Sequence, residues 1–310
     1  AIGIDIGGTF TDVVILRDDG SVGSAKTPST PGRLQEGLLL AIKAIAEKEN
    51  QSTEELLSSV ERIAHGTTVA TNTFIERRGA RVALLTTRGF EDTMVMQRMM
   101  GMTAGLTPSE LTDYSLRRVP EPLVSRQLTF GIRERIDYRG DEICPLIEED
   151  VRNAAKKIAE AGVEAVAISY LWSFKDTGHE QRTAALLKEE LPDVFVSISS
   201  ELAPRLGEYE RTATAVVNAY LGPLVRAYTD ELQTRLGDTK LFLLDSSGSV
   251  MTPMEAGNSP VRLLLSGPSG GVTAARFVGS QLGYENILTF DMGGTSTDVS
   301  IIKEGESGQR

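Results

Sequence analysis

The stretch GIDIGGTFTDV, residues 3–13, decides the fold, because the segment TFDMGGTSTDV repeats it near the other end of the chain. Aligning Asp5 with Asp291 brings the two copies into register without a gap. Each copy follows one apolar run and precedes another, and this pattern around a glycine pair predicts strand, tight turn and strand. The sequence therefore predicts two matching hairpins.

The two predicted turns have the chemistry of a phosphate site. Adjacent glycines allow positive φ and a close approach by another group, and successive backbone N–H groups form a concave anion site. Threonine hydroxyls add donors, and aspartate oxygens suit a Mg²⁺ ion that also holds a phosphate. One such segment alone is equally compatible with an ordinary hairpin, but two in-register copies favour a paired phosphate site. The residues are Asp5, Gly7, Gly8, Thr9, Thr11 and Asp12 in the first copy, and Asp291, Gly293, Gly294, Thr295, Thr297 and Asp298 in the second.

Length and charge narrow the classes of protein. With 310 residues the chain is long for one domain and comfortable for two. The net charge is −11, with both signs mixed along the chain, which argues against a nucleic-acid partner. The charge does not argue against ATP, which backbone groups and Mg²⁺ bind locally.

Cysteine content and hydropathy predict a cytoplasmic location. The single cysteine, Cys144, excludes an intrachain disulfide and agrees with a reducing compartment. No apolar run approaches the roughly 20 residues that cross a membrane, and no cationic leader is recognisable. We therefore expect no membrane partner.

Hydrophobic periodicity predicts a mixed α/β protein. Residues 1–27 have the pattern of three strands, and residues 33–50 that of an amphipathic helix. Helices and strands alternate over residues 148–199, which indicates parallel strand pairs. A long helical stretch over residues 207–236 contains Pro223, where we expect a kink or break.

The loop HGTT, residues 65–68, is expected to precede a helix N-terminus, a suitable place for an anion or a polarised carbonyl. His65 has either a substrate role or that of a hydrogen-bonded loop histidine. Asn72 lies one turn from Thr68 and faces either the same space or solvent. The other histidine, His179, falls in the polar first turn of a helix and is expected at the surface.

Two further segments stand out. Residues 88–125 are rich in methionine and form either a lid or partner surface or a long excursion packed on the core. Residues 261–282 read as a strand, then a glycine-rich approach to a helix N-terminus that includes Gly270 and Gly271. No GxxxxGK[ST] segment occurs in the chain, so this approach is not a P-loop.

Several separated motifs resemble, in order, the hydantoinase A and 5-oxoprolinase family. They are GIDIGGTFTDVV, HGTTVATN, RRGARVALLTTRGFED, EYERTATAVVNAYL, LLSGPSGGV and TFDMGGTSTDVS. The two glycine turns also resemble those of the wider actin, sugar kinase and heat-shock ATPase superfamily, in which two lobes close over Mg-ATP. The resemblance implies ribonuclease H-like ATPase lobes, the first over residues 1–192. Residues 193–310 would then hold linking helices and the start of the second lobe.

The resemblance also implies the chemistry. Family members use ATP to activate the carbonyl oxygen of a cyclic amide or ketone as a phosphate ester, and a partner subunit or domain of the hydantoinase B type completes hydrolysis or carboxylation. Phosphate is a good leaving group where an amide or ketone oxygen is a poor one, so catalysis is mostly positioning and charge neutralisation.

By this resemblance each site residue has an expected role. Asp5 and Asp291 would hold Mg²⁺ directly or through water, and Asp12 or Asp298 would orient the nucleophile. The substrate side would involve His65, Thr67, Thr68 and Asn72. Phosphates would be contacted by Gly7, Gly8, Thr9, Thr11, Gly293, Gly294, Thr295 and Thr297, with Gly270 and Gly271 nearby.

The chain departs from the superfamily pattern in one respect. The second lobe of the superfamily needs a full sheet and a later glycine-rich loop around adenosine, but few residues follow Asp298. The second lobe therefore looks truncated, and we expect this piece alone to lack an adenosine pocket and to turn over ATP poorly.

Three functions remain open on the sequence. The first is an ATP-dependent cyclic amidohydrolase of the hydantoinase or oxoprolinase type. The second is the same ATPase subunit in a ketone carboxylase acting on acetone or acetophenone. The third is a non-enzymatic actin-like or chaperone-like ATP switch, which would respond to a protein partner instead of a small carbonyl compound.

Overall fold

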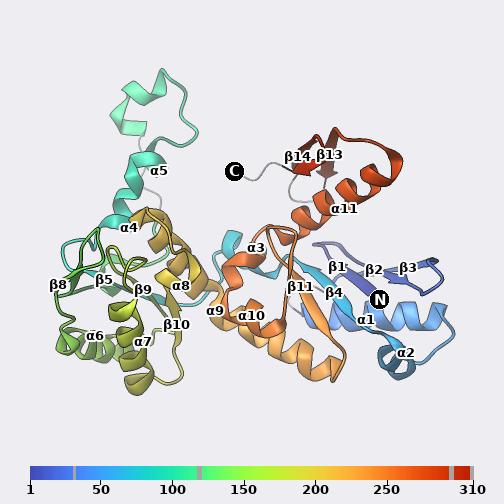
Figure 1. Ribbon diagram of the computed structural model, residues 1–310, viewed down its shortest axis with the longest axis horizontal. Helices are drawn as coiled ribbons and strands as arrows, with labels where there is room; N and C mark the ends of the chain where they lie inside the picture. The colour runs from blue at the N-terminus through green and yellow to red at the C-terminus, as the bar shows by residue number, and fades with distance from the viewer. Residues whose placement is uncertain (31–32, 117–120, 293–296, 308–310) are drawn as a thin grey trace. The chain divides into compact units, whose positions relative to one another are not determined.

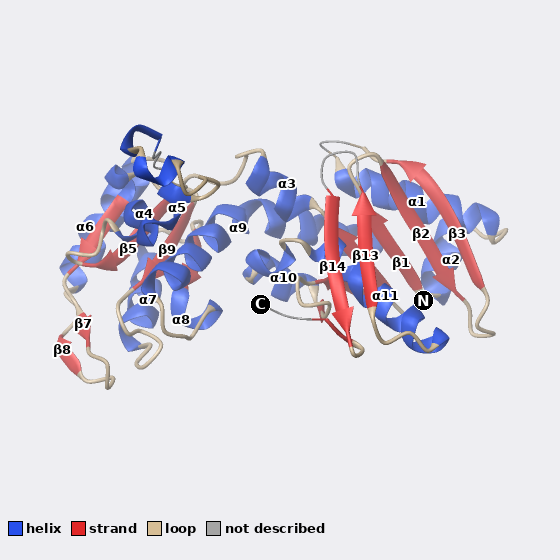
Figure 2. Cartoon of the chain, turned by 90° about the horizontal axis from the view of Figure 1, so that it is seen from above, coloured by secondary structure: helices blue, strands red, loops and turns tan. Residues whose placement is uncertain are grey.

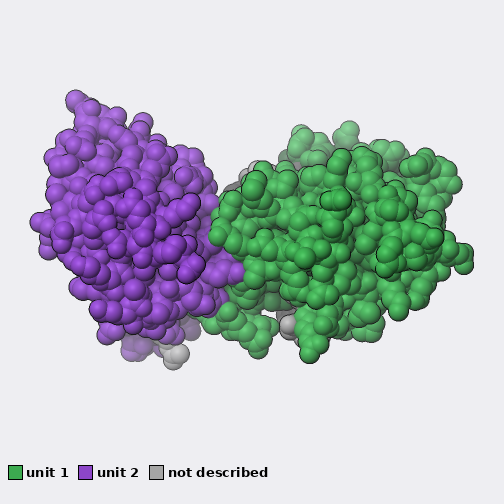
Figure 3. Space-filling view, turned by 90° about the horizontal axis from the view of Figure 1, so that it is seen from below, with its two compact units in different colours: residues 1–78, 224–310 green, residues 79–223 purple. Residues whose placement is uncertain are grey.

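A computed structural model of the chain describes residues 1–30, 33–116, 121–292 and 297–307. The chain forms two compact units, coloured separately in Figure 3. Unit 1 combines residues 1–78 with residues 224–310, and unit 2 is the continuous segment 79–223.

Unit 1 contains most of the strands that the repeated sequence predicts (Figure 1). Its elements are β1 (Ile2–Ile6), β2 (Phe10–Leu16), β3 (Val22–Pro28), α1 (Leu34–Lys48), α2 (Thr53–Ser59), β4 (Ile63–Thr67), α3 (Val69–Ile75), the second half of α9 (Glu208–Leu236), β11 (Leu241–Leu244), β12 (Val250–Met251), α10 (Pro253–Asn258), the 3-10 turn η5 (Pro260–Leu263), α11 (Ser266–Leu282), β13 (Ile287–Met292), β14 (Thr297–Lys303) and β15 (Glu306–Ser307).

The larger sheet of unit 1 has the strand order β12-β11-β4-β1-β2-β3. Strands β1, β4 and β11 are parallel, whereas β2, β3 and β12 run antiparallel to their neighbours. The expectation of three strands over residues 1–27 is confirmed. Because β1, β4 and β11 are parallel, their carboxyl ends meet at one edge of the sheet, where ligands bind in open α/β sheets.

One face of this sheet is apolar and buried. Ile2, Ile4 and Ile6 alternate with exposed or half-buried residues along β1, as a strand with one packed face requires. The expected helix over residues 33–50 is confirmed as α1, which packs against β1, β2 and β3 (Figure 2). Its buried residues Leu38 and Ile42 complete this part of the core. The opposite face carries Asp5 and Asp12 together with exposed apolar side chains such as Phe10 and Val14.

The second glycine motif lies in a separate antiparallel sheet of order β13-β14-β15. Helix α11 precedes this sheet in the chain and packs against β13 and β14 as well as β4 and β11. Both predicted hairpins are therefore present, and both belong to unit 1.

Unit 2 contains the alternating helices and strands. Its elements are β5 (Val82–Thr87), α4 (Thr93–Met96), η1 (Gln97–Met99), α5 (Met100–Thr103), η2 (Glu110–Thr112), η3 (Tyr114–Leu116), η4 (Arg126–Leu128), β6 (Thr129–Ile132), β7 (Arg135–Ile136), β8 (Glu142–Cys144), α6 (Glu148–Glu160), β9 (Ala165–Ser169), α7 (Gly178–Glu190), β10 (Phe195–Ile198), α8 (Ser199–Leu202) and the first half of α9.

The main sheet of unit 2 is parallel throughout, in the order β10-β9-β5-β6. Every residue of β5 and β9 is buried, as expected for strands covered on both faces. The predicted parallel pairing is thus confirmed. In its described part, which leaves out residues 117–120, the methionine-rich excursion holds only short helical segments. Met94 is buried and Met96 is 57% exposed, so both interpretations of it stay open.

Two expectations of local structure differ from the fold. Of the kink or break expected in the long helix, the break is absent, because α9 continues through Pro223, and the kink stays a prediction. The preceding Gly222 is explained by packing, since a Cβ there would lie 2.5 Å from the Phe195 ring. The strand expected from residue 261 is also absent: η5 occupies it, and Ser266 already begins α11. Leu265, which precedes α11, has a left-handed backbone with φ of 60°.

The predicted lobe boundary near residue 192 stays a prediction, because the compact units are defined by contacts alone. No helix in the described part of the chain is both long enough and apolar enough to cross a membrane.

His179, expected at the surface, is buried in unit 2, and that expectation is wrong. Its Nδ1 lies 2.9 Å from Glu134 Oε2, and its Nε2 lies 2.9 Å from Glu142 Oε2. Glu134 also accepts a hydrogen bond from the Thr87 hydroxyl. Desolvation disfavours the charged imidazole, but the bonds to the two carboxylates outweigh it and raise the pKa of His179. Burial also raises the pKa of Glu134.

This cluster predicts a stability that falls as the pH rises. A group whose pKa is raised by folding contributes fully below its unfolded pKa, and the contribution is lost as pH rises through the folded pKa. We expect His179→Gln to flatten this loss and to cost about 2 kcal/mol at pH 6, because buried Glu134 loses its partner. Urea unfolding from pH 6 to 9, followed by fluorescence of the single tryptophan, Trp172 in unit 2, measures both.

Glu142→Gln is the matched control, since it removes only the more exposed carboxylate of the cluster and should have a smaller effect. An unchanged pH dependence in His179→Gln would contradict the assignment.

Candidate functional site

A row of polar positions crosses the larger sheet of unit 1. The strand register places Asp5 opposite Asp12 on one side and opposite Gly66 on the other, and Asp12 opposite Lys26. Directly paired residues share a face of a sheet. This is the face opposite the buried isoleucines. Asp5 and Gly66 are each the last residue but one of their strands, so the row lies near the carboxyl ends of β1 and β4.

Gly66 is required by the close approach of a carboxylate. A Cβ on Gly66 would lie 3.1 Å from Asp5 Oδ1 and 3.5 Å from Leu244 Cδ1. Because Gly66 has no side chain, the Asp5 carboxylate can lie close to the strand at this position. Sequence analysis missed this role, because only the register of two distant strands reveals it.

The first glycine turn differs in detail from the expectation. Neither Gly7 nor Gly8 has a positive φ, so that prediction is wrong. The Gly7 N–H closes the turn by donating to Phe10 O at 3.0 Å, and a Cβ on Gly7 would lie 3.2 Å from the same oxygen. A Cβ on Gly8 would meet nothing within 4 Å. Gly8 and Thr9 are exposed at the tip, and among described residues their amides find no acceptor. The tip therefore has space and donors for an anion.

Carboxylates crowd around Asp5. Desolvation by the surrounding protein is the largest cause that raises the pKa of Asp5, and the charges of Asp12 and Asp291 raise it further. Asp291 comes from the second hairpin, so the two hairpins place carboxylates within electrostatic reach of each other. A cation between them would relieve this repulsion.

The second hairpin is described only in part. Asp291 in β13 pairs directly with Asp298 in β14, which reproduces the pairing of Asp5 with Asp12. Thr297 is exposed at the start of β14. Gly293, Gly294 and Thr295 lie outside the described residues.

Thr11 supports the turn instead of facing solvent. Its side chain is fully buried, and its Oγ1 lies 3.2 Å from Ser29 Oγ. Ser29 in turn donates to Gly7 O at 2.7 Å. The hydroxyl of Thr11 is therefore engaged below the turn, and the expected phosphate contact is not supported.

His65 is a core residue. It lies inside β4 and not in a loop, so the expected loop over residues 65–68 is wrong. Its Nδ1 donates to Ile4 O at 3.3 Å, which leaves Nε2 to accept from the Tyr228 hydroxyl at 2.6 Å. Complete burial lowers the pKa of His65 to about 4, so the ring is neutral. This geometry supports the hydrogen-bonded alternative and not a catalytic role.

The remaining substrate candidates divide between core and site. Thr67 is fully buried, and its carbonyl accepts a hydrogen bond from Ser266. Thr68 Oγ1 donates to Ile6 O at 3.3 Å, directly before the glycine turn. Asn72 Nδ2 donates to Thr68 Oγ1 at 3.1 Å, which confirms that these two side chains share one space. Thr68 and Asn72 therefore lie beside the first turn.

The glycine-rich segment before the second hairpin is helical. Gly270 and Gly271 lie inside α11, not in a loop before it, because the helix already begins at Ser266. A Cβ on Gly270 would lie 3.3 Å from Leu244 Cδ1, so this glycine allows α11 to approach β11. The N-terminus of α11 is fixed by the bond from Ser266 Oγ to Thr67 O at 3.0 Å.

An ion pair between half-exposed Arg262 and buried Asp245 holds the adjoining loop. Arg262 Nη2 donates to Asp245 Oδ2 at 2.6 Å, and Asp245 also accepts the backbone N–H groups of Ser247 and Ser249. Burial opposes ionisation, but these hydrogen bonds outweigh it and lower the pKa of Asp245. Ser269 Oγ joins α11 to the same loop through Ser246 O.

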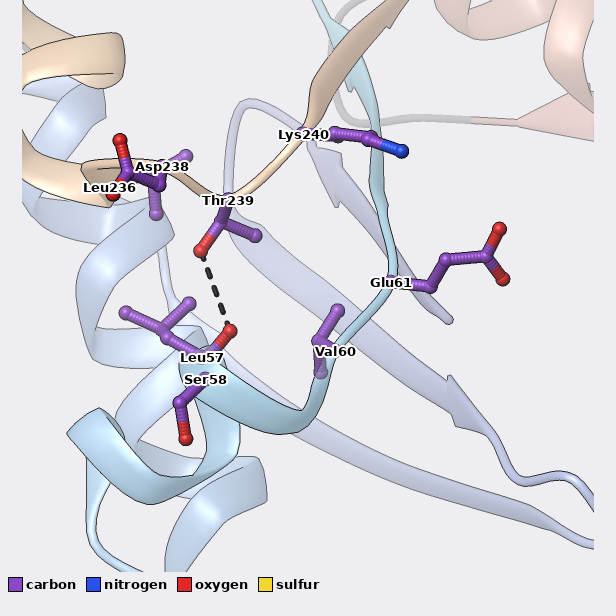
Figure 4. Close-up of a pocket in the computed structure, with 8 residues that line it drawn as sticks. All are labelled: Leu57, Ser58, Val60, Glu61, Leu236, Asp238, Thr239 and Lys240. Carbon is purple, nitrogen blue, oxygen red and sulfur yellow. Dashed lines mark hydrogen bonds between the residues drawn. The ribbon is translucent and has the colours of Figure 1, made fainter.

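No ready-made metal cage exists in the described ranges: no group of three or more His, Cys, Asp or Glu side chains is arranged to hold an ion. Any Mg²⁺ here would rest on one or two carboxylates, with water and phosphate completing its shell, as is usual for this ion. The pocket in Figure 4, lined by Leu57, Glu61, Lys240 and neighbours, precedes β4 and β11 and is thus at the opposite ends of these strands from Gly66.

The fold and the site together define a mixed α/β protein in which two hairpins with the same motif each pair two aspartates directly. Two family profiles match the chain: the hydantoinase/oxoprolinase N-terminal region over residues 1–191, and hydantoinase/oxoprolinase over residues 211–309. The chain belongs to the hydantoinase/oxoprolinase family, as its motifs predict.

Similar proteins span both chemistries of the family. The chain is 37% identical to the acetophenone carboxylase gamma subunit of Aromatoleum aromaticum, over 98% of this chain and 42% of that protein. It is 36% identical to the caprolactamase alpha subunit of Pseudomonas jessenii, over 99% of this chain and 44% of that protein. A nucleotide-free acetone carboxylase structure superposes with a TM-score of 0.89 at 30% identity, over 98% and 44%. The chain thus spans less than half the length of these relatives.

The crowding of carboxylates predicts that Asp5 destabilises the protein without ligand. Because folding raises the pKa of Asp5, its ionised form lowers the free energy of unfolding, and this cost develops as the pH rises through the unfolded and folded pKa values. We expect Asp5→Asn to raise the urea midpoint at pH 7, with the difference narrowing toward pH 4. Asp18→Asn, in the exposed β2–β3 turn, should change neither midpoint. A less stable Asp5→Asn protein at pH 7 would contradict the inferred repulsion.

Proposed function

We propose that the chain is the ATP-binding part of an ATP-dependent enzyme that phosphorylates the carbonyl oxygen of a small substrate. A cyclic amide is the leading substrate class, which makes the enzyme a cyclic amidohydrolase of the hydantoinase or oxoprolinase type. One observation carries the proposal: Asp291 pairs directly with Asp298 in the second hairpin, just as Asp5 pairs directly with Asp12 beside the first glycine turn.

We infer that the larger sheet is the first ribonuclease H-like ATPase lobe. The order β3-β2-β1-β4-β11, with β2 antiparallel to its neighbours, supports this assignment. The second hairpin would begin the second lobe, which the chain carries only in part. Unit 2 would be an insertion between β4 and β11 of the first lobe.

The residues at the two turns have complementary roles in this proposal. Asp5 and Asp291 would hold Mg²⁺ through water, and the ion would supply charge neutralisation for a triphosphate. The exposed amides of Gly8 and Thr9 would bind phosphate oxygens, with the hydroxyls of Thr9 and Thr297 as further donors. Phosphoryl transfer then depends on positioning and on electrostatic stabilisation.

The substrate carbonyl would lie beside the terminal phosphate. Asp12 or Asp298 would orient the attacking oxygen, while Thr68 and Asn72 would contact the substrate, because they lie beside the first turn. The phosphorylated oxygen becomes a good leaving group, so a hydantoinase B-type partner subunit or domain could complete the reaction.

A second candidate function is the ATPase subunit of a ketone carboxylase. The 37% identity to an acetophenone carboxylase subunit favours it as much as the 36% identity to a caprolactamase subunit favours the amidohydrolase. The two functions share every residue role proposed above and differ in the substrate and in the use of bicarbonate.

The deciding experiment measures ATP turnover by the full-length protein with its partner subunit. The panel contains hydantoin, five- and seven-membered lactams, acetone and acetophenone, each with and without bicarbonate. Stimulation by a cyclic amide without bicarbonate is the expected result, and ketone stimulation that needs bicarbonate would assign the carboxylase. If neither cyclic amides nor ketones change ATP turnover and only a protein partner does, the proposal is overturned in favour of an ATP switch.

The position of Asp5 should be sensitive to the size of residue 66. Gly66→Ala places a Cβ 3.1 Å from Asp5 Oδ1 and must displace the carboxylate. We expect about a tenfold or larger fall in kcat/KM for Mg-ATP, because small displacements of catalytic groups are costly. Gly3→Ala is the matched control: it lies two residues before Asp5 on the same strand, and its Cβ would meet nothing within 4 Å. Equal activity in the two variants would exclude this placement of Asp5.

A further inference from the structure

Lys26 is the cation in the row of polar positions that contains Asp5 and Asp12. It lies in β3 directly opposite Asp12, and its Nζ is 3.0 Å from Asp12 Oδ1 and 3.1 Å from Oδ2. A lysine ammonium has three N–H donors. Its one hydrogen bond to Asp12, at Oδ2, leaves two donors, and about half of the side chain is exposed to solvent.

An aromatic ring fixes the same ammonium group from another side. Lys26 Nζ lies 5.0 Å from the centroid of the Phe10 ring, a cation–π distance. Phe10 is the residue whose carbonyl closes the glycine turn by accepting the Gly7 N–H. Lys26 is therefore held beside the turn by two partners, neither of which covers it.

The second hairpin offers no equivalent. Asp298 corresponds to Asp12, but β15 pairs only with the far end of β14, at Ile302 and Lys303. Within the described ranges Asp298 takes part in no ion pair. The two hairpins thus repeat the carboxylates, and among the residues that the structure describes a lysine is held beside the first turn and none is paired with Asp298.

Lys26 supplies positive charge at a site that otherwise carries several carboxylates. Asp5 lies directly opposite Asp12 in the sheet, and the charges of Asp12 and Asp291 both raise the pKa of Asp5. A bound triphosphate adds further negative charge, of which a single Mg²⁺ neutralises only part. Much of the remaining negative charge lies on the terminal phosphate of ATP. ADP has no phosphate at that position. A fixed ammonium group with a spare donor is suited to that phosphate.

We propose that Lys26 binds the terminal phosphate of the nucleotide and keeps Asp12 oriented beside it. This inference rests on the proposed function and adds to it a residue that discriminates ATP from ADP. Lys26 acts as a point charge whose position is set before the ligand arrives, so little reorganisation is needed on binding.

The test compares the binding of a non-hydrolysable ATP analogue and of ADP, each with Mg²⁺, by calorimetry on the full-length protein. We expect Lys26→Met to raise the Kd of the ATP analogue by about tenfold or more and that of ADP by less than about twofold, as expected for one lost charge-assisted bond. Lys26→Arg keeps the charge and should restore most of the difference. Lys43→Met, at an exposed lysine of α1, is the control and should change neither Kd.

Each outcome is decisive. Equal losses for both nucleotides, or no loss for either, would overturn the role of Lys26 while leaving the proposed function intact. A wild-type protein that binds neither nucleotide would overturn both. Thermal unfolding of each variant shows whether a loss reflects misfolding, and the ATP-to-ADP ratio with the arginine rescue would not follow from a purely structural role.

Discussion

The register of β1 against its two neighbours is the constraint on which the site depends. β1 is antiparallel to β2 and parallel to β4, so Asp5 lies opposite Asp12 and Gly66 at once. A slip of one residue would move Asp5 to the buried face and expose Ile4 or Ile6. The packing of these isoleucines, 0–3% exposed, on the α1 side therefore fixes where the carboxylate appears. The hydrophobic core and the polar row are two consequences of one alternation.

Polar groups around the site are kept in place by burial on the other face. The side chains of Thr11 and His65 point into the core and form hydrogen bonds there, to Ser29 and to Tyr228. The backbone carbonyl of buried Thr67 accepts a hydrogen bond from Ser266 at the start of α11. None of them faces the space above the glycine turn. They connect the turn, strand β4, helix α9 and helix α11, so the exposed residues between them need little adjustment to meet a ligand. Several motif residues that look catalytic in the sequence therefore have a structural role, because their hydrogen bonds lie in the core below the site.

Much of the fold was predictable from the sequence, because it follows local patterns. Alternating apolar residues identified β1 to β3, helical spacing identified α1, and the repeated aspartates identified both hairpins. The errors have a common cause. The apolar residues around Leu263 fit a strand as well as the helical turn that they form. The burial of His65 and His179 depends on hydroxyl and carboxylate partners from distant segments, which the local sequence does not show. The ion pairs of Lys26 and Arg262 depend likewise on register and loop closure, which residue spacing does not encode.

The order of the chain through the two units has a consequence for synthesis. β4 and its parallel neighbour β11 are separated in the chain by the whole of unit 2, residues 79–223. On the ribosome, unit 2 emerges complete while unit 1 still lacks its fifth strand and both of its C-terminal hairpin strands. Domains generally fold as their sequences emerge. The inserted unit can therefore finish folding first, and the nascent edge of β4 must wait, unpaired, until β11 leaves the exit tunnel.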